Sequence, residues 1–490
     1  MGFRRYEASK DNTITNAFKP NLVESASYSN MGKSDILEIF HIYAQASTAS
    51  QENSRILMQF DTSQISSDRQ LGLIPASGSV SYYLKLFNAK HSQTTPQDFT
   101  VVVAPVSKSW DEGIGLDMEN YSDEYASNWV SSSEGTAWNN LGGDYHLTPR
   151  YEQTFTNGTE DLELNVTSLV EEWLAGTKSN YGFGIFLTSS QEQSTSRSYY
   201  TKKFFARGTE FFFKKPHLEA RFNATVKDTR GNFCYSSSLA TSQENLNTIY
   251  LYNNFNGSLR NIPSIGTGSI YVSIYSGSTG PSGSALTLVA DGVNVSSTSP
   301  TVVTGSWVSK GVYKAVFAIT ASDTPYTTLF DVWHNGNLTT QFNTSSIETK
   351  IIKANNNSET SKYLIKITNL KDYYYHNEET RIRVYARPRN WYPNFYTVAQ
   401  DKPETTILQS SSYSVIRIAD NLEAIPFGTG STLHTLMNYD VSGNYFDFNM
   451  ANLEPDYAYG FVVSIYNDNL SAWEINPELF KFRVEKRQME

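Results

Sequence analysis

The sequence predicts an all-β protein built from consecutive β-sandwiches. The 490-residue chain contains 32 Tyr, 27 Phe and 8 Trp, and aromatic residues favour strands. Its short apolar runs are separated by stretches rich in Ser, Thr, Asn and Gly, which favour turns. A helical pattern stands out in one segment, residues 162–187. Because so long a chain exceeds one hydrophobic core, we expect roughly three domains.

The first unit is expected to span residues 1–225. Its predicted strands are residues 36–43, 55–60, 80–87, 100–105, 162–165, 182–188, 202–213 and 217–222. Residues 107–151 form a long polar insertion that contains three tryptophans. A loop of this length within a compact domain is usually functional, so we expect it to bind a partner or form an interface.

The segment 162–187 is predicted to form a strand, a short helix, a turn and a second strand. One face of the helix would carry apolar side chains at helical spacing, namely Val166, Leu169, Val170, Trp173 and Leu174. Ser168 and Glu171 have the spacing of a capping box, and Gly176 stands where a helix ends. We expect this single short helix to close one end of the first sandwich.

Two further sandwiches are expected in residues 226–345 and 346–490. The predicted strands of the second unit are residues 249–252, 270–275, 286–290, 311–319 and 328–333. Those of the third are residues 347–353, 363–370, 380–386, 414–417, 445–450, 460–465 and 480–485. In the third unit, Leu453 and Pro455 precede Tyr459 at the head of an alternating strand. This pattern predicts a tyrosine corner, in which a buried Tyr hydroxyl bonds to upstream backbone, and an immunoglobulin- or fibronectin-like sandwich.

Three motifs in the first unit resemble the DNRLRE-type jelly-roll domains, which are similar to carbohydrate-binding modules. They are SRILMQFD at 54–61, VAPVSKSWDEG at 103–113, and the strand–helix–strand segment 162–187. The chain departs from the family pattern at Gln59, where an arginine is usual, and in its long insertion. The insertion and residues 11–19 also resemble tailed-phage virion proteins, so the resemblance implies a jelly-roll module of a phage particle.

Charge and hydropathy narrow the classes of partner. The net charge of −10 is spread along the chain without a cluster of Lys and Arg, so we expect no nucleic-acid partner. We expect no membrane span, because no apolar run approaches about 18 residues. The chain opens MGFRRYEASKDN, without the apolar core of a secretory signal, and its single cysteine, Cys234, excludes an intrachain disulfide. A virion protein fits both cytoplasmic synthesis and a modular, extracellular style of architecture.

The sequence lacks the motifs of common enzymes and metal sites. It contains no P-loop, dinucleotide fingerprint, nucleophile elbow or Cys/His zinc spacing, so we expect no catalytic residues, no metal and no cofactor. Acidic residues gather at 111–124. This stretch is open to three interpretations: a solvated acidic loop, a calcium-stabilised loop, or one carrying the carboxylate pair of a glycosidase.

Two groups of residues are candidate binding sites. In the insertion, Trp110, Trp129, Trp138 and Tyr145 could stack on sugar rings, fill the end of the jelly roll, or bury against a neighbouring subunit. In the third unit, a basic and aromatic patch is predicted to be a protein interface, comprising Tyr374, Arg383, Arg387, Arg389 and Trp391. Residues 1–19 could be a free arm that docks onto a neighbour or the first edge strand of the first unit.

The leading hypothesis is a non-enzymatic structural component of a tailed-phage virion, in the neck, tail or baseplate apparatus. Its partners would be other virion proteins, and we expect a homo-oligomer arranged as a symmetric ring or collar. The alternative is a phage adhesin or fibre protein that recognises host surface glycans through exposed tryptophans. A polysaccharide-degrading enzyme is a third hypothesis and requires two converging carboxylates near the acidic stretch.

Overall fold

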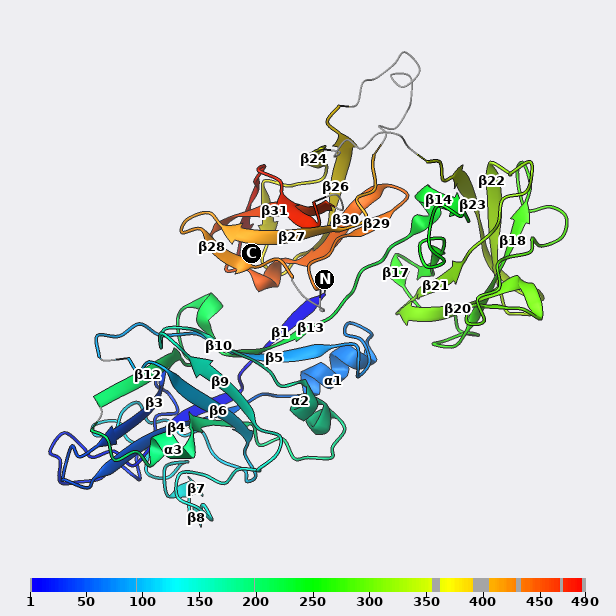
Figure 1. Cartoon of the computed structure of the whole chain (residues 1–490). Helices are drawn as coiled ribbons and strands as arrows, with labels where there is room; N and C mark the ends of the chain where they lie inside the picture. The colour runs from blue at the N-terminus through cyan, green and yellow to red at the C-terminus, as the bar shows by residue number, and fades with distance from the viewer. Residues whose placement is uncertain are drawn as a thin grey trace. The chain divides into compact units, whose positions relative to one another are not determined.

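The computed structural model describes residues 2–93, 95–197, 199–354, 362–390, 405–428, 433–467 and 470–486. Their regular secondary structure is almost entirely β-strand, which confirms the all-β fold class (Figure 1). The chain divides into two compact units. One comprises Phe3–Gln70 and Ile74–Phe222, and the other comprises Asn223–Glu490 with the short segments Met1–Gly2 and Leu71–Leu73.

The first unit is a sandwich of two antiparallel sheets. The four-stranded sheet has the order β1 (Phe3–Glu7), β13 (His217–Arg221), β5 (Ser81–Leu86) and β10 (Leu162–Asn165). The second has the order β12 (Tyr199–Phe205), β3 (Ile36–Tyr43), β4 (Gln51–Gln59), β11 (Phe183–Leu187), β6 (Phe99–Pro105) and β9 (Tyr151–Phe155), with β2 (Lys10–Thr15) also paired to β4. A separate hairpin pairs β7 (Ser131–Ser133) with β8 (Thr136–Ala137).

The N-terminal residues belong to these sheets. Strand β1 pairs with β13, and β2 runs antiparallel to β4 with Lys10 opposite Gln59 and Thr15 opposite Ser54. Of the two alternatives for residues 1–19, the described residues therefore follow the strand and not the free arm.

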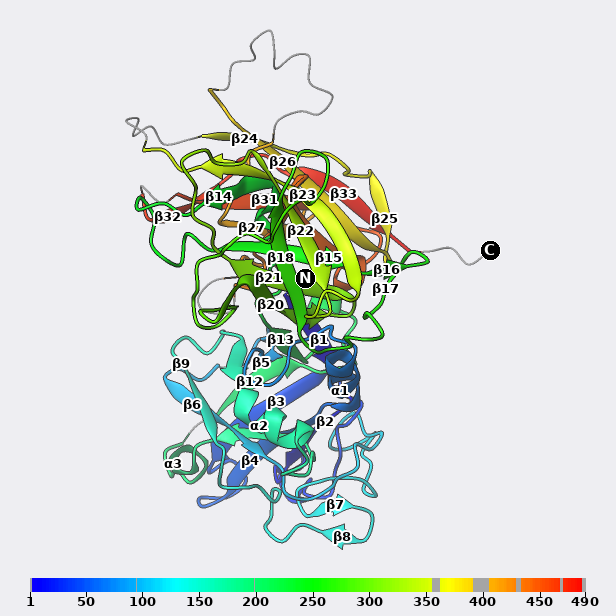
Figure 2. The same cartoon turned by 90° about the vertical axis from the view of Figure 1, so that its right-hand side faces the viewer.

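The described residues of the first unit form three short α-helices where the sequence predicted one. They are α1 (Ser63–Gln70), α2 (Thr167–Leu174) and α3 (Ser189–Glu192). Helix α2 is the predicted one, and its Leu169, Val170 and Trp173 are buried in the main core. Helix α1 lies against it, where Arg69 donates to both oxygens of Glu171 at 3.0 and 2.7 Å (Figure 2).

The ends of α2 match the prediction at one terminus only. Gly176 has φ +70° and donates its N–H to the Trp173 carbonyl at 3.1 Å, as expected at a helix end. The capping box is wrong, because the N-cap residue is Val166, which has no side-chain acceptor. The N–H groups of Thr167 and Leu169 donate instead to Asn165 Oδ1 at 3.1 Å and to the Tyr151 hydroxyl at 3.2 Å. The Ser168 hydroxyl pairs with the Tyr151 hydroxyl at 2.6 Å, and Glu171 is taken by α1.

The other compact unit, here called the second unit, includes both of the sandwiches expected after residue 225 and contains two groups of strands. The first is an eight-stranded sheet with the order β14 (Phe233–Tyr235), β23 (Gln341–Ile351), β22 (Thr328–His334), β18 (Ile270–Ser276), β20 (Ser299–Ser309), β21 (Val312–Phe317) and β15 (Asn247–Tyr252), with β19 (Val295–Ser296) on β20. Strand β20 pairs with β18 through its first half and with β21 through its second, so the sheet curves around one apolar core. A small hairpin joins β16 (Asn254–Phe255) and β17 (Ser258–Leu259).

The second group of strands is a sandwich of four and six strands. The smaller sheet has the order β24 (Tyr363–Ile367), β26 (Glu379–Pro388), β30 (Gly443–Asn449) and β29 (Asn438–Asp440). The larger has the order β25 (Tyr373–Tyr375), β33 (Phe480–Glu485), β31 (Ala458–Asn467), β27 (Ser411–Arg417) and β28 (Leu422–Ile425), with β32 (Ala472–Ile475) on β31. Short 3₁₀ turns complete the described secondary structure: η1 (Phe212–Lys214), η2 (Thr229–Asn232) and η4 (Met450–Asn452).

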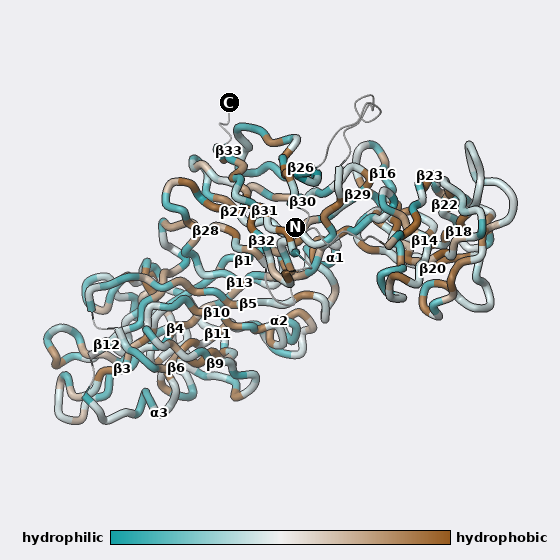
Figure 3. Tube along the Cα trace, turned by 45° about the horizontal axis from the view of Figure 1, so that its top comes forward, coloured by the Kyte–Doolittle hydropathy of each residue, from teal (hydrophilic) through white to brown (hydrophobic). Residues whose placement is uncertain are grey.

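The predicted tyrosine corner is confirmed. Tyr459 at the start of β31 is fully buried, and its hydroxyl donates to the Glu454 carbonyl at 2.8 Å. Along the chain, the most hydrophobic segments fall mainly on strands, which is the pattern expected when alternate side chains face a core (Figure 3).

Candidate functional site

The three tryptophans of the 107–151 insertion form a second small core within the first unit. Trp110, Trp129 and Trp138 are only 2%, 6% and 6% exposed. The Trp110 indole N–H donates to the Tyr181 carbonyl at 2.9 Å, and that of Trp138 donates to the Asn128 carbonyl at 2.9 Å. The apolar neighbours in this cluster are Ile14, Leu57 and Val106.

The idea of a solvent-facing platform is therefore corrected for these three rings. Their faces are covered by β2, β4 and the insertion itself, and two of their N–H groups are already bonded. Tyr145 is half-buried, packs on Phe186 at 4.8 Å between ring centroids, and donates its hydroxyl to the Gly142 carbonyl at 2.7 Å. These residues pack on the outer face of the larger sheet and do not fill the end of the jelly roll, because Leu57 of β4 points away from the main core that its neighbours Ile56 and Met58 join.

Arg55 of β4 anchors the insertion to the sandwich. Its guanidinium donates to both oxygens of Glu192 in α3 at 2.9 and 2.6 Å, and to the Gly142 carbonyl at 3.0 Å. Three rings lie 5.3, 5.6 and 5.2 Å from its guanidinium carbon, those of Trp129, Tyr145 and Phe186. A planar, permanently charged side chain is suited to this combination of a bidentate carboxylate and aromatic faces.

Two glycines allow the insertion to approach the sheet closely. A Cβ atom at Gly184 of β11 would stand 2.0 Å from the Tyr145 ring. Gly142 has φ +83°, and a Cβ there would stand 2.8 Å from the Trp129 ring. Because any side chain would displace an aromatic ring, both positions require glycine.

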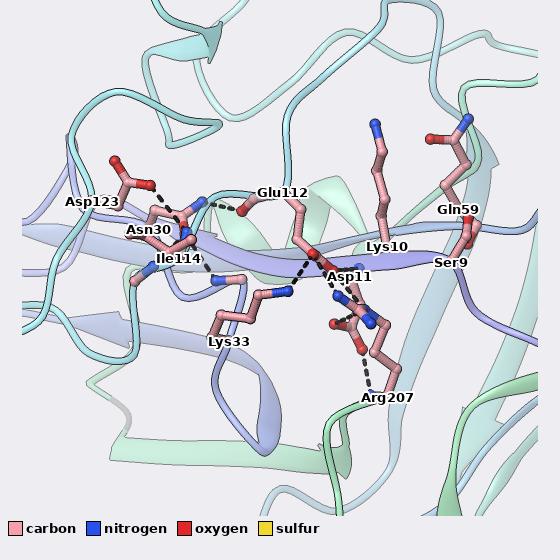
Figure 4. A network of polar contacts seen from close by, with 12 residues as sticks. Ser9, Lys10, Asp11, Asn30, Lys33, Gln59, Glu112, Ile114, Asp123 and Arg207 are labelled. Carbon is pink, nitrogen blue, oxygen red and sulfur yellow. Dashed lines mark hydrogen bonds and ion pairs between the residues drawn. The ribbon is translucent and has the colours of Figure 1, made fainter.

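A charged network ties the beginning of the insertion to β2 (Figure 4). The Arg207 guanidinium donates to both oxygens of Glu112 at 2.6 Å, and Lys33 donates to Glu112 at 2.9 Å. Asp11 of β2 accepts the backbone N–H of Arg207 at 2.6 Å, and its own N–H donates to Glu112 at 3.0 Å. The insertion is thus held by residues from three distant parts of the sequence.

Burial and hydrogen bonding shift the pKa values of the two carboxyl groups of this network in opposite directions. Asp11 is almost fully buried, and this burial raises its pKa to about 6 against the opposing hydrogen bond from Arg207. Burial also works against the charge of Glu112, but hydrogen bonds from Arg207 and Lys33 outweigh it and lower the pKa. Both carboxyl groups are engaged by Arg207, so they are not placed as a free acid–base pair.

Residues 113–126, here called the rim loop, are held at both ends by hydrogen bonds to the Asn30 side chain. The Asn30 amide donates to the carbonyls of Glu112 at 2.6 Å and Ser127 at 2.8 Å. Its side-chain oxygen accepts the N–H of Gly115 at 3.2 Å, and Lys33 N–H donates to the Gly115 carbonyl at 2.9 Å. The two ends of the rim loop are therefore clamped to the same short segment of chain.

Two aspartates fix the rim loop from within. Asp117 accepts the backbone N–H groups of Glu119, Asn120 and Tyr121 at 2.8, 2.7 and 3.0 Å. These hydrogen bonds, that of Tyr121 foremost, lower the pKa of Asp117. Asp123 binds two parts of the loop backbone. One of its side-chain oxygens accepts the N–H of Ile114 and the other accepts the N–H of Tyr125, each at 3.0 Å.

Two aspartates of the acidic stretch thus accept hydrogen bonds from the backbone of their own loop. Among the described residues, no group of three or more His, Cys, Asp or Glu side chains is placed to hold a metal ion. Asp117 and Asp123 satisfy amide groups of the loop, which is the role of aspartate in a tight turn.

The rim loop leaves large apolar side chains in solvent. Ile114, Leu116, Tyr121 and Tyr125 are 74%, 49%, 65% and 72% exposed. Their backbones are joined within the loop, since Leu116 N–H donates to the Tyr121 carbonyl at 2.8 Å and Asp123 accepts the N–H groups of Ile114 and Tyr125. Sequence reasoning singled out the tryptophans and missed these residues, whose only signal was apolar side chains interleaved with acidic ones.

The second predicted cluster is not assembled. Tyr374 lies on β25 and is fully buried against Phe482, whereas Arg383 and Arg387 lie on β26 of the other sheet. Arg383 donates to Asp440 at 2.7 Å, which neutralises its charge locally. Arg389 follows β26 and is exposed, and Trp391 lies outside the described residues. The predicted interface role of Tyr374 is corrected to a core role, because its ring has no exposed face.

One Ser–His pair in the second unit has the wrong hydrogen bonds for nucleophilic catalysis. Ser273 and His334 lie 3.1 Å apart, and both are buried. The Nδ1 atom of His334 accepts the N–H of Gly336 at 3.0 Å, so its Nε2 carries the proton and donates to Ser273. Nearby Asp331 is bound by Arg230 at 2.6 and 2.8 Å and does not orient the histidine.

Comparisons with known proteins give only distant likenesses. No family model matches the chain, and no curated protein matches it. Among solved structures, the Ig1-2 module of the Drosophila receptor tyrosine phosphatase DLAR is 6% identical, covers 49% of this chain and 91% of its own, and has a TM-score of 0.15. Bovine butyrophilin is 10% identical with a TM-score of 0.12, covering 47% of this chain and 89% of its own.

A DUF4785 family protein from Legionella pneumophila is 6% identical, with a TM-score of 0.13, and covers 98% of this chain and 90% of its own. Likenesses this weak carry no functional conclusion. In the described parts of the chain, no helix is both long and apolar enough to cross a membrane.

Proposed function

We propose that this chain is a non-enzymatic structural component of a tailed-phage virion, in the neck, tail or baseplate apparatus, and that it docks onto other virion subunits there. The observation that supports docking most directly is the rim loop. It holds four large apolar side chains in solvent on a backbone that is fixed by Asn30, Asp117 and Asp123. Exposed apolar patches mark interaction sites, and a preorganised one binds with a smaller entropy cost.

Other features fit a mechanical role. The insertion is packed around a small apolar core that contains Trp110, Trp129 and Trp138. Its Glu112 carboxylate pairs with the guanidinium of Arg207, whose backbone N–H donates to Asp11 of β2. The phage assignment itself rests on the resemblance of the first unit to DNRLRE-type modules and of the insertion to virion proteins, and a ring or collar of identical copies belongs to the same proposal.

The glycan-binding alternative has lost the residues that motivated it. Stacking on a pyranose requires an exposed aromatic face, and the three tryptophans are covered. We therefore do not propose it as a second function.

Mass spectrometry of purified particles tests the proposal. The chain should be present in every particle preparation at a fixed stoichiometry, and a nonsense mutation in its coding sequence should yield incomplete particles. Complete, infectious particles that lack the chain would refute a structural role.

A further inference from the structure

We infer that the rim loop docks onto a segment of a partner protein that carries Lys or Arg among apolar side chains. This rests on the proposed function and names the chemistry of the partner. The site is defined by the exposed side chains of Ile114, Leu116, Tyr121 and Tyr125 together with the carboxylates of Glu119 and Glu124.

The apolar half of the site is large for a surface loop. Three of its four apolar side chains are at least 65% exposed, although burial within the first unit would be favourable for each. Tyr28 extends the patch, since it is 56% exposed and precedes Ser29, whose hydroxyl donates to the Met118 carbonyl at 2.9 Å. Tyr is enriched among the residues that dominate binding at protein interfaces.

The charge of the site selects a cationic partner. Within the described chain, Glu119 and Glu124 are exposed and form no ion pair. The sequence contains no Lys or Arg between Lys108 and Arg150, so the insertion itself supplies no counter-charge. The neighbouring cations, Lys33 and Arg207, are both engaged with Glu112. Complementary charge steers association and disfavours acidic partners, which also excludes nucleic acid and anionic lipid surfaces.

Hydrogen bonds within the loop preorganise it for docking. Asp117 and Asp123 direct their oxygens at backbone N–H groups, so they hold the loop shape while Glu119 and Glu124 point their charge outward from an exposed turn. A partner that brings its own Lys or Arg would pair with these carboxylates and cover the tyrosine rings at the same time. Both contributions are needed, so removing either should weaken docking.

A binding assay in solution tests the chemistry of the site on the full chain. The probes are a short peptide of alternating Leu and Lys and its Leu–Glu counterpart. We expect the Leu–Lys peptide to bind, the Leu–Glu peptide not to bind, and added salt to weaken binding. Replacing both Tyr121→Ser and Tyr125→Ser, or both Glu119→Gln and Glu124→Gln, should weaken binding by about tenfold or more.

Matched controls separate this site from the general negative charge of the protein. Glu134→Gln alters an exposed glutamate on the β7–β8 hairpin of the same insertion, and Tyr326→Ser alters an exposed tyrosine of the second unit. Both should leave peptide binding unchanged. Equal losses in the controls, equal binding of both peptides, or binding of neither would overturn the inference.

Cross-linking in particles distinguishes this inference from the proposed function. A photoreactive benzoylphenylalanine at Tyr121 should cross-link to a Lys- or Arg-containing segment of another virion protein, identified by mass spectrometry. A cross-link to an acidic or neutral segment, or none, would overturn the inference and leave the structural role standing. Absence of the chain from particles would refute the structural role, while the peptide assay would still decide the inference.

Discussion

Arg55 shows how a single side chain determines the shape of the candidate site. It bonds the carboxylate of Glu192 and the carbonyl of Gly142 while three aromatic rings surround it. Its position near the head of a predicted strand was visible in the sequence, but Glu192 lies 137 residues further along the chain. No periodicity or local motif connects residues so far apart, so this contact required the structure.

Replacing this arginine should destabilise the first unit. In Arg55→Met the carboxylate of Glu192 would remain buried without its partner, which costs about 3–5 kcal/mol of unfolding free energy. Arg150→Met is the matched control, because Arg150 pairs with Glu152 at an exposed site and should cost less than about 1 kcal/mol. Urea unfolding measures both, and equal losses would contradict the anchoring role.

Asp11 should make stability depend on pH in the acid range. Its folded-state pKa of about 6 exceeds the ordinary 3.8, so the folded state binds more protons than the unfolded state between these values. Stability contributed by Asp11 therefore falls as pH rises through this window. The unfolding free energy of the wild type minus that of Asp11→Asn should decrease by about 1–3 kcal/mol between pH of about 4 and about 6.

Asp117→Asn provides a control of opposite sign. The pKa of Asp117 is lowered by backbone hydrogen bonds, so its stabilising contribution is lost as pH falls below its ordinary pKa. The corresponding difference should increase as pH rises through the acid range. A flat or rising difference for Asp11→Asn would show that its carboxyl group is not perturbed as described.

At the scale of elements, most of the predictions that succeeded rested on local patterns, although the local pattern of the capping box failed. The apolar face of α2, its closing glycine and the corner at Tyr459 are patterns within a few residues, and the structure confirms them. Helix α1 was missed because only Ile65 and Asp68 of its eight residues are buried, which leaves no apolar stripe. Tertiary contacts fix it instead, since Asp68 accepts from the Tyr6 hydroxyl at 2.8 Å.

The tyrosine corner should contribute measurably to the stability of the third predicted sandwich. Tyr459→Phe removes the hydroxyl that donates to the half-buried turn at Glu454 and should cost about 1–2 kcal/mol. Tyr457→Phe is the matched control, because that ring is more than a third exposed and lies beneath Arg417, a contact that Phe retains. Thermal unfolding measures the stability of both variants. An unchanged stability of Tyr459→Phe would show that the tyrosine corner does not stabilise the sandwich.

At the scale of the whole molecule, composition predicted the fold class better than it predicted the site. Aromatic residues serve equally in cores and at interfaces, so the sequence alone could not place Trp110, Trp129 and Trp138 inside. These tryptophans are buried, whereas Tyr121 and Tyr125 of the same insertion are exposed. The sequence alone did not single out these two tyrosines. The proposed docking surface is thus the exposed part of the 107–151 insertion, whose tryptophans form its buried part.

Cryo-EM of the intact particle that contains this chain tests the central claim most directly. We expect ordered copies in the neck, tail or baseplate, with the rim loop covered by a neighbouring subunit that places Lys or Arg near Glu119 and Glu124. Particles without density for the chain, or ordered copies whose rim loop faces solvent on every side, would contradict it.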